Sequence, residues 1–375
     1  MTNPATHSPQ AFVDYLSSHL PAVEAALAAA SATPLTDAPT NSAGEKPATA
    51  ASAPSVEASA PADDLTCYLY EPLTHFTSSG GKRVRPVLAL LGAEAVGGRA
   101  EDALSTGVAI ELFQSAALIH DDIADRSELR RGEPCLYRTQ GTGLAINDGD
   151  LALVRVIEVV LEDTSLDEAR KLRVIQELVS MERHTLEGQA LDLGWVRDGR
   201  WDITSNDYLY MVESKTAWYS AAIPLKAGAI AGGGSEQAAD GLAEVGMLAG
   251  VAFQLTDDLL NLVGDAAAQG KDFRSDITEG KRTLAVVWAL EHLNEADRTE
   301  LVGLLTSSTT NVDELARAVE LLEEGGGIER CRALARERAD AACERAQALA
   351  REELITPQAC ELLCSMSDFF VERAG

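Results

Sequence analysis

The sequence predicts an all-α fold, and three observations support this prediction. Ala, Leu and Glu, which favour helices, dominate the chain, and helical periodicity is almost continuous from residue 63 onward. Alternating runs of β-branched residues with strand length are scarce. Glycine and proline interrupt the periodicity, for example at Gly80-Gly81, Gly97-Gly98 and Gly325 to Gly327. These breaks divide the chain into ten or more helices, and no tandem repeat is found.

The N-terminal part of the chain differs from the rest. Within residues 1–30, apolar side chains recur at helical spacing, and these are Phe12, Leu16, Leu20, Val23 and Leu27. Residues 31–62 are almost entirely Ala, Ser, Thr and Pro, which bury too little surface to offset the entropy of ordering. We expect a helix in residues 1–30 packed on the main domain, a disordered linker or loop over 31–62, and one helical domain over 63–375. A tethered extension of a terminal helix is the alternative for 31–62.

Composition excludes several classes of protein. The chain has 31 Lys and Arg against 59 Asp and Glu, a net charge of −28, whereas nucleic-acid surfaces and sites that dock on anionic lipid are basic. No apolar run reaches the roughly 18 residues of a membrane span, and the first 45 residues contain no Lys or Arg. We therefore expect no span, no leader and a cytoplasmic location. The six Cys form no CxxC pair, and we expect reduced thiols.

Two acidic clusters interrupt apolar helical segments. The first is Asp121-Asp122-Ile123-Ala124-Asp125, and the second is Asp257-Asp258-Leu259-Leu260-Asn261. At 100° per residue, Asp121 and Asp125 share one helix face. Carboxylates in apolar surroundings need cations, and Mg²⁺ prefers such oxygen ligands. A solvated acidic helix face is the alternative for the first cluster, and metal binding and a solvated face are equal alternatives for the second.

Basic residues stand beside glycine or proline breaks near these clusters. They occur in Gly80-Gly81-Lys82-Arg83-Val84-Arg85-Pro86, Arg130-Arg131-Gly132, Lys215-Thr216, Gly270-Lys271 and Gly280-Lys281. Lys82 and Arg85 are three residues apart and can converge on one anion, and the planar guanidinium matches phosphate oxygens. Ordinary surface positions are the alternative for each taken singly. No phosphate-binding loop or dinucleotide fingerprint is present, and His120 is interpreted as a packed imidazole.

Together with Gln114 and Phe253-Gln254, this ordered set of motifs resembles the trans-polyprenyl diphosphate synthase family. The resemblance covers nearly the whole chain outside residues 31–62. It implies an isoprenoid-synthase-type bundle around a deep central cavity, usually a homodimer. The implied reaction is the Mg²⁺-dependent head-to-tail (1′-4) condensation of an allylic diphosphate with isopentenyl diphosphate. Three Mg²⁺ are expected with diphosphate bound, and Mn²⁺ is an alternative ion.

The resemblance also implies a role for each matching residue. Metal ligands would be Asp121, Asp122, Asp125, Asp257, Asp258 and Asn261, and these Asp residues with Lys215 would carry catalysis. The allylic diphosphate would be bound by Arg130, Lys215, Thr216, Gln254, Lys271 and Lys281, and isopentenyl diphosphate by Lys82, Arg85, Gln114, Arg131 and His75. Asn261 stands where the family usually has Asp, although Asn also occurs there in active relatives.

Small residues before the first acidic cluster bear on product length. Ala117 lies one helical turn before Asp121, with Ala116 beside it, and short-chain family members often carry an aromatic floor there. Two methyl side chains predict a tunnel that stays open, with Phe113 as the next floor. We expect a product longer than fifteen carbons, with twenty as the single best value. Close crossing of two helices is the alternative reason for the small residues.

Three rival functions were considered. A terpene cyclase of the same fold would leave Lys82, Arg85 and Arg131 without a role, because it needs no second substrate site. A non-catalytic partner subunit of another synthase would commonly lose Asp residues or the Arg pair. A generic metal-binding bundle does not explain the grouped basic residues.

Overall fold

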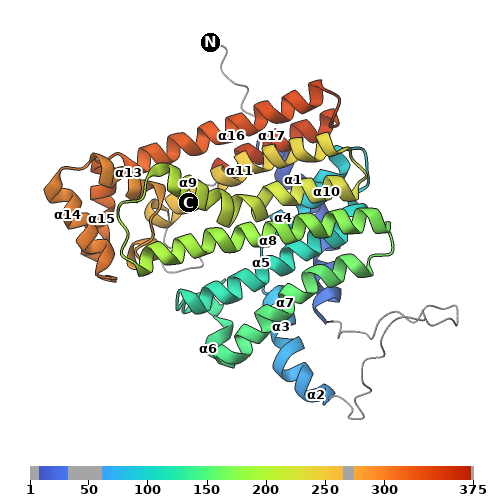
Figure 1. Cartoon of the computed structure of the whole chain (residues 1–375), viewed down its shortest axis with the longest axis horizontal. Helices are drawn as coiled ribbons and strands as arrows, with labels where there is room; N and C mark the ends of the chain where they lie inside the picture. The colour runs from blue at the N-terminus through green and yellow to red at the C-terminus, as the bar shows by residue number, and fades with distance from the viewer. Residues whose placement is uncertain (1–7, 33–60, 265–273, 373–375) are drawn as a thin grey trace.

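The computed structural model describes residues 8–32, 61–264 and 274–372, and it confirms the predicted all-α fold (Figure 1). The elements in chain order are α1 (Gln10–Ala32), α2 (Ala62–Leu65), η1 (Thr66–Tyr70), α3 (Glu71–Ser78), α4 (Val84–Ala95), η2 (Ala100–Ala103), α5 (Leu104–Ala124), β1 (Leu129–Arg130), β2 (Glu133–Pro134), α6 (Leu136–Gln140), α7 (Thr142–Glu162), α8 (Glu168–Arg197), α9 (Ser205–Val212), η3 (Glu213–Ala222), α10 (Ile223–Ala231), α11 (Glu236–Val263), α12 (Ser275–Thr278), α13 (Leu284–His292), α14 (Glu295–Thr306), α15 (Val312–Glu324), α16 (Gly327–Arg351) and α17 (Pro357–Val371). η1 and η3 have π-helical geometry, and η2 is a 3₁₀ turn.

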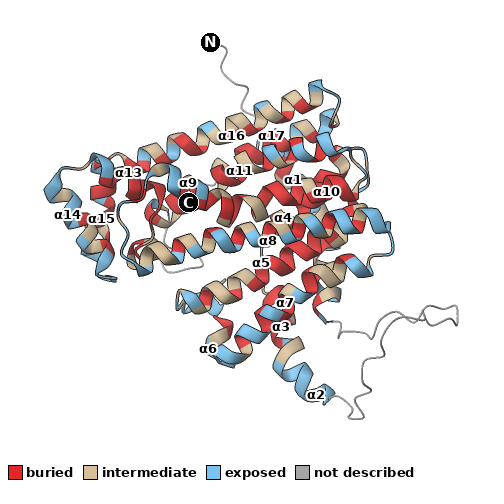
Figure 2. Cartoon of the chain, viewed as in Figure 1, coloured by how far each residue is buried: buried red, intermediate tan, exposed pale blue. Residues whose placement is uncertain are grey.

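The helices form a layered bundle in which α16, α11, α8 and α5 follow one another across the molecule (Figure 1). Buried residues concentrate along α4, α5, α10 and α11 in the middle of the bundle (Figure 2). At one end, α13, α14 and α15 build a second apolar cluster against α9 and α16. The two helices that carry the acidic clusters, α5 and α11, are therefore core elements.

Glycines allow η3 to lie in close contact with both of its neighbouring long helices. A Cβ atom on Gly188 of α8 would lie 2.3 Å from the backbone nitrogen of Lys215. On α11, a Cβ atom on Gly246 would lie 2.5 Å from the carbonyl oxygen of Ala221. Any larger residue would push these helices apart, so the glycines fix how closely α8 and α11 approach the segment that carries Lys215.

The N-terminal helix packs on the main domain through α3, α5 and α17. The ring of Phe12 lies 5.5 Å from that of Phe369, and the backbone N–H of Phe12 donates to Ser365 Oγ at 2.9 Å. The helix continues to Ala32, two residues beyond the predicted boundary. Residues 33–60, the main part of the predicted linker, lie outside the described residues.

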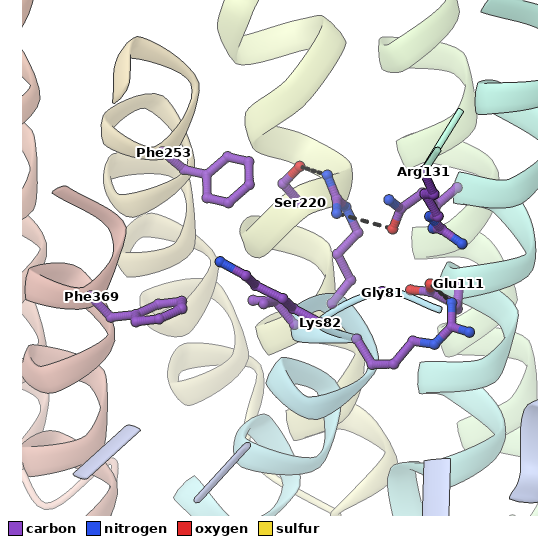
Figure 3. Close-up of a pocket in the computed structure, with 11 residues that line it drawn as sticks. Gly81, Lys82, Glu111, Arg131, Ser220, Phe253 and Phe369 are labelled. Atoms are coloured by element: carbon purple, nitrogen blue, oxygen red, sulfur yellow. Dashed lines mark hydrogen bonds and ion pairs between the residues drawn. The ribbon is translucent and has the colours of Figure 1, made fainter. Parts of the chain in front are cut away.

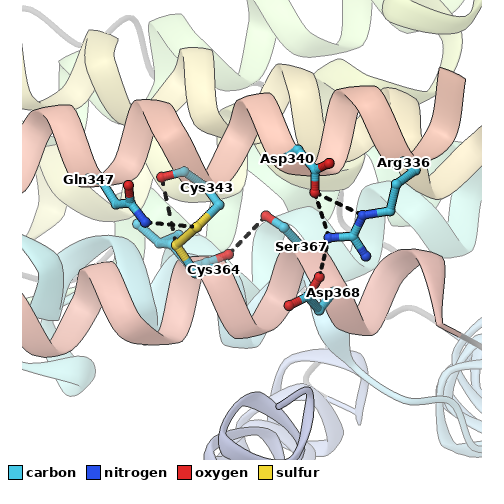
Figure 4. The surroundings of a disulfide bond; sticks show 8 residues. Arg336, Asp340, Cys343, Gln347, Cys364, Ser367 and Asp368 are labelled. Carbon is cyan, nitrogen blue, oxygen red and sulfur yellow. Dashed lines mark hydrogen bonds and ion pairs between the residues drawn. A yellow bond between two sulfur atoms is a disulfide. The ribbon is translucent and has the colours of Figure 1, made fainter. Parts of the chain in front are cut away.

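A disulfide joins α16 to α17, contrary to the expectation of reduced thiols (Figure 4). It links Cys343 and Cys364, whose Cα atoms are 4.5 Å apart. This bond could not be predicted from the sequence, because the two residues lie on consecutive helices and meet only after these pack side by side. Cys67, Cys135, Cys331 and Cys360 are free thiols.

Two helical segments, residues 100–124 and 236–263, are long and apolar enough to cross a membrane by length and composition. Buried residues make up 67% and 61% of their most apolar windows. Core helices pass the same test, and these segments carry the two acidic clusters in the middle of the bundle.

The disulfide gives a prediction about stability. Replacing Cys343 and Cys364 by Ser should lower the free energy of unfolding by about 3 kcal/mol, because the bond closes a loop with a sequence separation of 21 in the unfolded chain. Urea unfolding of the wild type and the double variant, without reductant, measures the difference. Cys360→Ser on the same helix is the control. Equal unfolding midpoints for the wild type and the double variant would contradict the prediction.

Candidate active site

A cavity of about 610 Å³ lies in the middle of the bundle between α5, α8, η3 and α11. It collects side chains from both acidic clusters and from four of the basic segments. The charged and amide side chains that line it include Gln114, Asp121, Asp125, Arg130, Gln189, Asp192, Lys215, Gln254, Asp257, Asp258, Asn261 and Lys281. Segments far apart in the sequence therefore meet at one place, with carboxylates and ammonium groups on the same walls.

The first acidic cluster splits between the cavity and the interior. Asp121 and Asp125 line the cavity, whereas Asp122 is only 1% exposed. Its carboxylate oxygens accept hydrogen bonds from Arg130 Nε at 3.0 and 3.3 Å and from a second nitrogen of the same guanidinium. Because neighbouring helical residues point 100° apart, Asp122 cannot share the direction of Asp121. Its position supports an anchoring role rather than the predicted metal ligation.

A short hairpin sends the adjacent cations Arg130 and Arg131 to different places. β1 and β2 pair in antiparallel register, and Arg131 and Gly132 occupy the turn with φ of 55° and 82°. Glycine is favoured at such a positive φ. Arg130 reaches Asp122 beside the large cavity, and Arg131 donates to Ser79 Oγ at 3.3 Å beside a second cavity.

The second acidic cluster is organised in a similar way. Asp257 and Asp258 both reach the cavity wall, but Asp258 is 6% exposed and both of its oxygens are engaged. Tyr208 Oη donates to Oδ2 at 2.5 Å, and Gln254 Nε2 donates to Oδ1 at 2.7 Å. Burial raises the pKa of Asp258, and the charge of Asp257 adds to this rise, against the opposing effect of these bonds. Asp258 is thus an anchor, and Tyr208 was missed because nothing in its sequence surroundings connects it to the cluster.

Asn261 connects α11 to α12. Its amide nitrogen donates to Ser275 Oγ at 3.1 Å, and its oxygen accepts from the backbone N–H of Asp276 at 3.2 Å. An aspartate carboxylate could accept but could not donate. The amide is therefore suited to this position, and its contacts do not support the predicted role as a metal ligand.

Asp192 on α8 holds two lysines together. Lys215 Nζ lies 2.5 Å from its Oδ2 and Lys281 Nζ lies 3.4 Å from the same atom, while Lys281 also reaches Asp125 Oδ1 at 3.3 Å. Burial opposes ionisation of Asp192, but the two ammonium groups lower its pKa to about 2. Asp192 was not among the predicted site residues. The only available sequence signal was its spacing of three from Gln189, which places both on one helix face. In the structure Gln189 donates to Asp121 Oδ1 at 2.6 Å.

A second, smaller cavity of about 100 Å³ lies beside the first and has a basic side and an aromatic side (Figure 3). Its charged and amide lining includes Lys82, Arg85, Gln114 and Arg131, and Phe253 and Phe369 supply the rings. The Arg85 guanidinium donates to Gln114 Oε1 at 3.0 Å and to Ser220 Oγ at 2.8 Å. Arg85, Gln114 and Phe253 line both cavities, so these two spaces share a wall.

Arg83, between the two predicted anion-binding residues, has a structural role. Its side chain is fully buried and donates to Glu111 Oε1 and Glu24 Oε1, each at 2.7 Å, and to the carbonyl of Thr77. Its backbone is left-handed, with φ of 48°. Arg83 therefore fixes the loop before α4 onto α1, α3 and α5. The neighbouring residues Lys82 and Arg85 thus extend from a backbone segment that is held in place.

The remaining predicted residues have mixed positions. Thr216, Phe113 and Ala117 line the large cavity. Ala116 lies outside its lining and is fully buried in a cluster with Leu73 and Phe76, so its position does not support a role in product length. His75 pairs with Glu133 at 3.0 Å, with its side chain 68% exposed, and it lines neither cavity. Lys271 lies outside the described residues.

Comparison with known proteins agrees with this arrangement. The polyprenyl synthetase family model matches residues 66–322. A short chain isoprenyl diphosphate synthase of Methanothermobacter thermautotrophicus is 40% identical, over 80% of this chain and 88% of the relative. A geranylfarnesyl diphosphate synthase of Natronomonas pharaonis is 34% identical, over 82% and 90%. The crystal structure of a geranylgeranyl pyrophosphate synthase from Corynebacterium glutamicum, complexed with isoprenyl diphosphate and magnesium, superposes with a TM-score of 0.74 at 26% identity, covering 97% of this chain and 98% of that one.

The charge arrangement around Asp192 predicts a pH-dependent contribution to stability. The pKa of Asp192 falls from 3.8 to about 2 on folding, so its ionised form stabilises the fold by roughly 2 kcal/mol at pH 7. That contribution is present above pH 4 and is lost as the pH falls toward 2. Asp192→Asn should therefore be less stable than the wild type in urea unfolding at pH 7, and the difference should shrink at pH 3. A pH-independent difference would contradict this assignment.

Proposed function

This chain belongs to the polyprenyl synthetase family, and from this premise we infer that it is a prenyltransferase that joins an allylic diphosphate to isopentenyl diphosphate, head to tail, giving a longer trans-prenyl diphosphate. The observation that supports this most strongly is the pair of adjoining cavities. The larger has carboxylates and lysines for one diphosphate, and the smaller has Lys82, Arg85 and Arg131 for another, beside the ion pair of Arg83 and Glu111. Two anionic substrates can thus be held side by side.

We propose that Asp121, Asp125 and Asp257 hold Mg²⁺ together with the allylic diphosphate. These carboxylates line one cavity, yet among the described residues no three acidic, His or Cys side chains converge into a ready-made metal site. Such a donor set suits Mg²⁺, which uses few carboxylates and completes its shell with phosphate oxygens and water. When bound, the ions would neutralise the negative charge that develops on the departing diphosphate. The magnesium-containing relative supports the proposal, and the expected number of ions is three.

The protein side chains have defined tasks in this scheme. Lys215 and Lys281, held by Asp192, point ammonium groups at the diphosphate of the allylic substrate, where they stabilise its departure. Lys82, Arg85 and Arg131 bind the second diphosphate and fix its alkene beside the carbon that becomes electron-deficient. The C1–O bond of the allylic substrate breaks, the alkene supplies the electron pair for the new C–C bond, and a proton then leaves, with the released diphosphate as the acceptor we expect.

The shared wall suits this chemistry. The Arg85 guanidinium lies 4.5 Å from the Tyr219 ring centroid, and Tyr219 stacks edge-on against Phe113 at 5.7 Å. Aromatic surface between the two sites excludes water from an allylic cation. A cyclase would have no use for the smaller basic cavity, and a non-catalytic subunit would have no use for the lysine-lined acidic walls.

We propose that Phe113 and Ala117 limit the length of the product. Both line the large cavity on α5, with Leu118, Leu153 and Leu186 continuing the apolar wall. The small side chain of Ala117, one helical turn before Asp121, leaves room in the cavity, so we expect a product longer than fifteen carbons. Twenty carbons stays the best single value, and the geranylfarnesyl relative marks a longer alternative.

We further propose a homodimer formed through α7 and α8. Four apolar side chains on α8 recur every seven residues and are 37% to 66% exposed, and these are Leu172, Val179, Leu186 and Leu193. Val154 and Leu161 on α7 are each 55% exposed. A long apolar stripe of this kind is typical of a surface that a second copy covers. The cytoplasmic location stays a prediction, and the disulfide is a feature that reducing compartments disfavour.

Product analysis tests the reaction. The protein with Mg²⁺, isopentenyl diphosphate and an allylic diphosphate of five, ten or fifteen carbons should yield longer prenyl alcohols after dephosphorylation, identified by mass. Asp121→Ala and Asp257→Ala should each lose about 10²-fold or more in rate, because charge on the leaving group is no longer neutralised. Products from the allylic substrate alone would indicate a cyclase, and no turnover at all would indicate a non-catalytic subunit.

Ala117→Phe tests the assignment of the cavity floor. A ring at this position should block the apolar end of the cavity, so the product distribution should shift to shorter chains while turnover continues. Gas chromatography of the dephosphorylated products measures the shift. An unchanged distribution would remove Ala117 from the floor.

Val179→Glu tests the dimer. A carboxylate in the middle of the stripe, away from the cavity lining, should convert a dimer into a monomer. Sedimentation velocity of the wild type and the variant gives both masses. A monomeric wild type would refute the dimer, and a variant that remains a dimer would refute this interface.

A further inference from the structure

The C-terminal helix contributes to the smaller cavity, although it lies outside the residues that match the family model. Phe369 of α17 forms one side of that cavity, and Phe253 of α11 forms another. Lys82 Nζ lies 5.7 Å from the centroid of the Phe369 ring. Figure 3 shows the nitrogen end of Lys82 directed between the two rings, and Arg131 on the opposite side of the cavity.

Several contacts fix the position of Phe369. Phe12 of α1 packs 5.5 Å from it, and the neighbouring Phe370 packs edge-on against Phe253 at 4.9 Å. The adjacent residue Asp368 accepts a hydrogen bond from Arg336 of α16, and the disulfide at Cys364, about one turn earlier, joins the same two helices (Figure 4). The ring thus packs on α1, and the part of α17 that carries it is held against α11 and α16.

The cavity therefore has two chemically distinct sides. Lys82, Arg85 and Arg131 suit a diphosphate, and two aromatic rings suit a short hydrocarbon next to it. Isopentenyl diphosphate has both parts. We propose that Phe369 is a substrate-binding residue whose ring covers the five-carbon alkenyl group of isopentenyl diphosphate and steadies the Lys82 ammonium over its face. The proposal rests on the proposed function, and it assigns the hydrocarbon half of the smaller cavity to α11 and α17.

Steady-state kinetics with each substrate varied in turn tests this assignment. Phe369→Ala should raise the KM for isopentenyl diphosphate about ten- to a hundredfold, the size expected for losing one aromatic contact. The KM for the allylic diphosphate should change by less than about twofold. Leu362→Ala is the matched control, because Leu362 lies seven residues earlier on the same face of α17 and lines neither cavity. It should leave both KM values unchanged.

A second variant separates the loss of the aromatic ring from misfolding of Phe369→Ala. Phe369→Leu keeps apolar volume and should raise the same KM by a smaller factor, with a melting temperature close to that of the Leu362→Ala control. Equal increases in both KM values, or no increase in either, would overturn the assignment in an enzyme whose wild type turns over. A wild type that never consumes isopentenyl diphosphate would instead refute the proposed function.

Discussion

The active-site architecture depends on the cost of placing carboxylates inside a helical bundle. Each buried Asp around the central cavity is matched by a group that offsets this cost. Asp122 is paired with Arg130, Asp192 with two lysines, and Asp258 with Tyr208 and Gln254. In both acidic clusters the second Asp is therefore held by partners within the bundle. Asp121 and Asp257 then line one cavity from opposite helices.

The segment between these walls, η3, supplies a lysine that balances the carboxylates. η3 is a π-helical stretch, a rare geometry that is frequent at functional sites, and it presents Lys215 and Thr216 to the large cavity and Ser220 to the smaller one. Glycines on α8 and α11 let both helices approach η3 closely. Lys215 thereby comes within reach of Asp192, and a diphosphate between the walls would meet cations already in position. Preorganised charge of this kind costs no rearrangement during the reaction.

Much of the site could be predicted from the sequence, because its main residues occur in short segments with recognisable chemistry. The all-α fold followed from periodicity, and Asp121, Asp125, Asp257, Lys82 and Arg85 line the two cavities as expected. The sequence could not show which partner each side chain meets. Arg83 appears equivalent to its basic neighbours until α1 and α5 bring two carboxylates to it. Tyr208, Asp192 and Phe369 act through contacts with distant helices, and the disulfide exists only because α16 and α17 pack together.

We propose that the two acidic walls bind one diphosphate through divalent cations. A crystal structure of the protein grown with Mg²⁺ and inorganic diphosphate tests it most directly. We expect diphosphate in the large cavity, with ions between it and Asp121 and Asp125 on one side and Asp257 on the other, and with Lys215 and Lys281 on its oxygens. Diphosphate bound by the basic side chains alone, with no ion at either acidic wall, would contradict it.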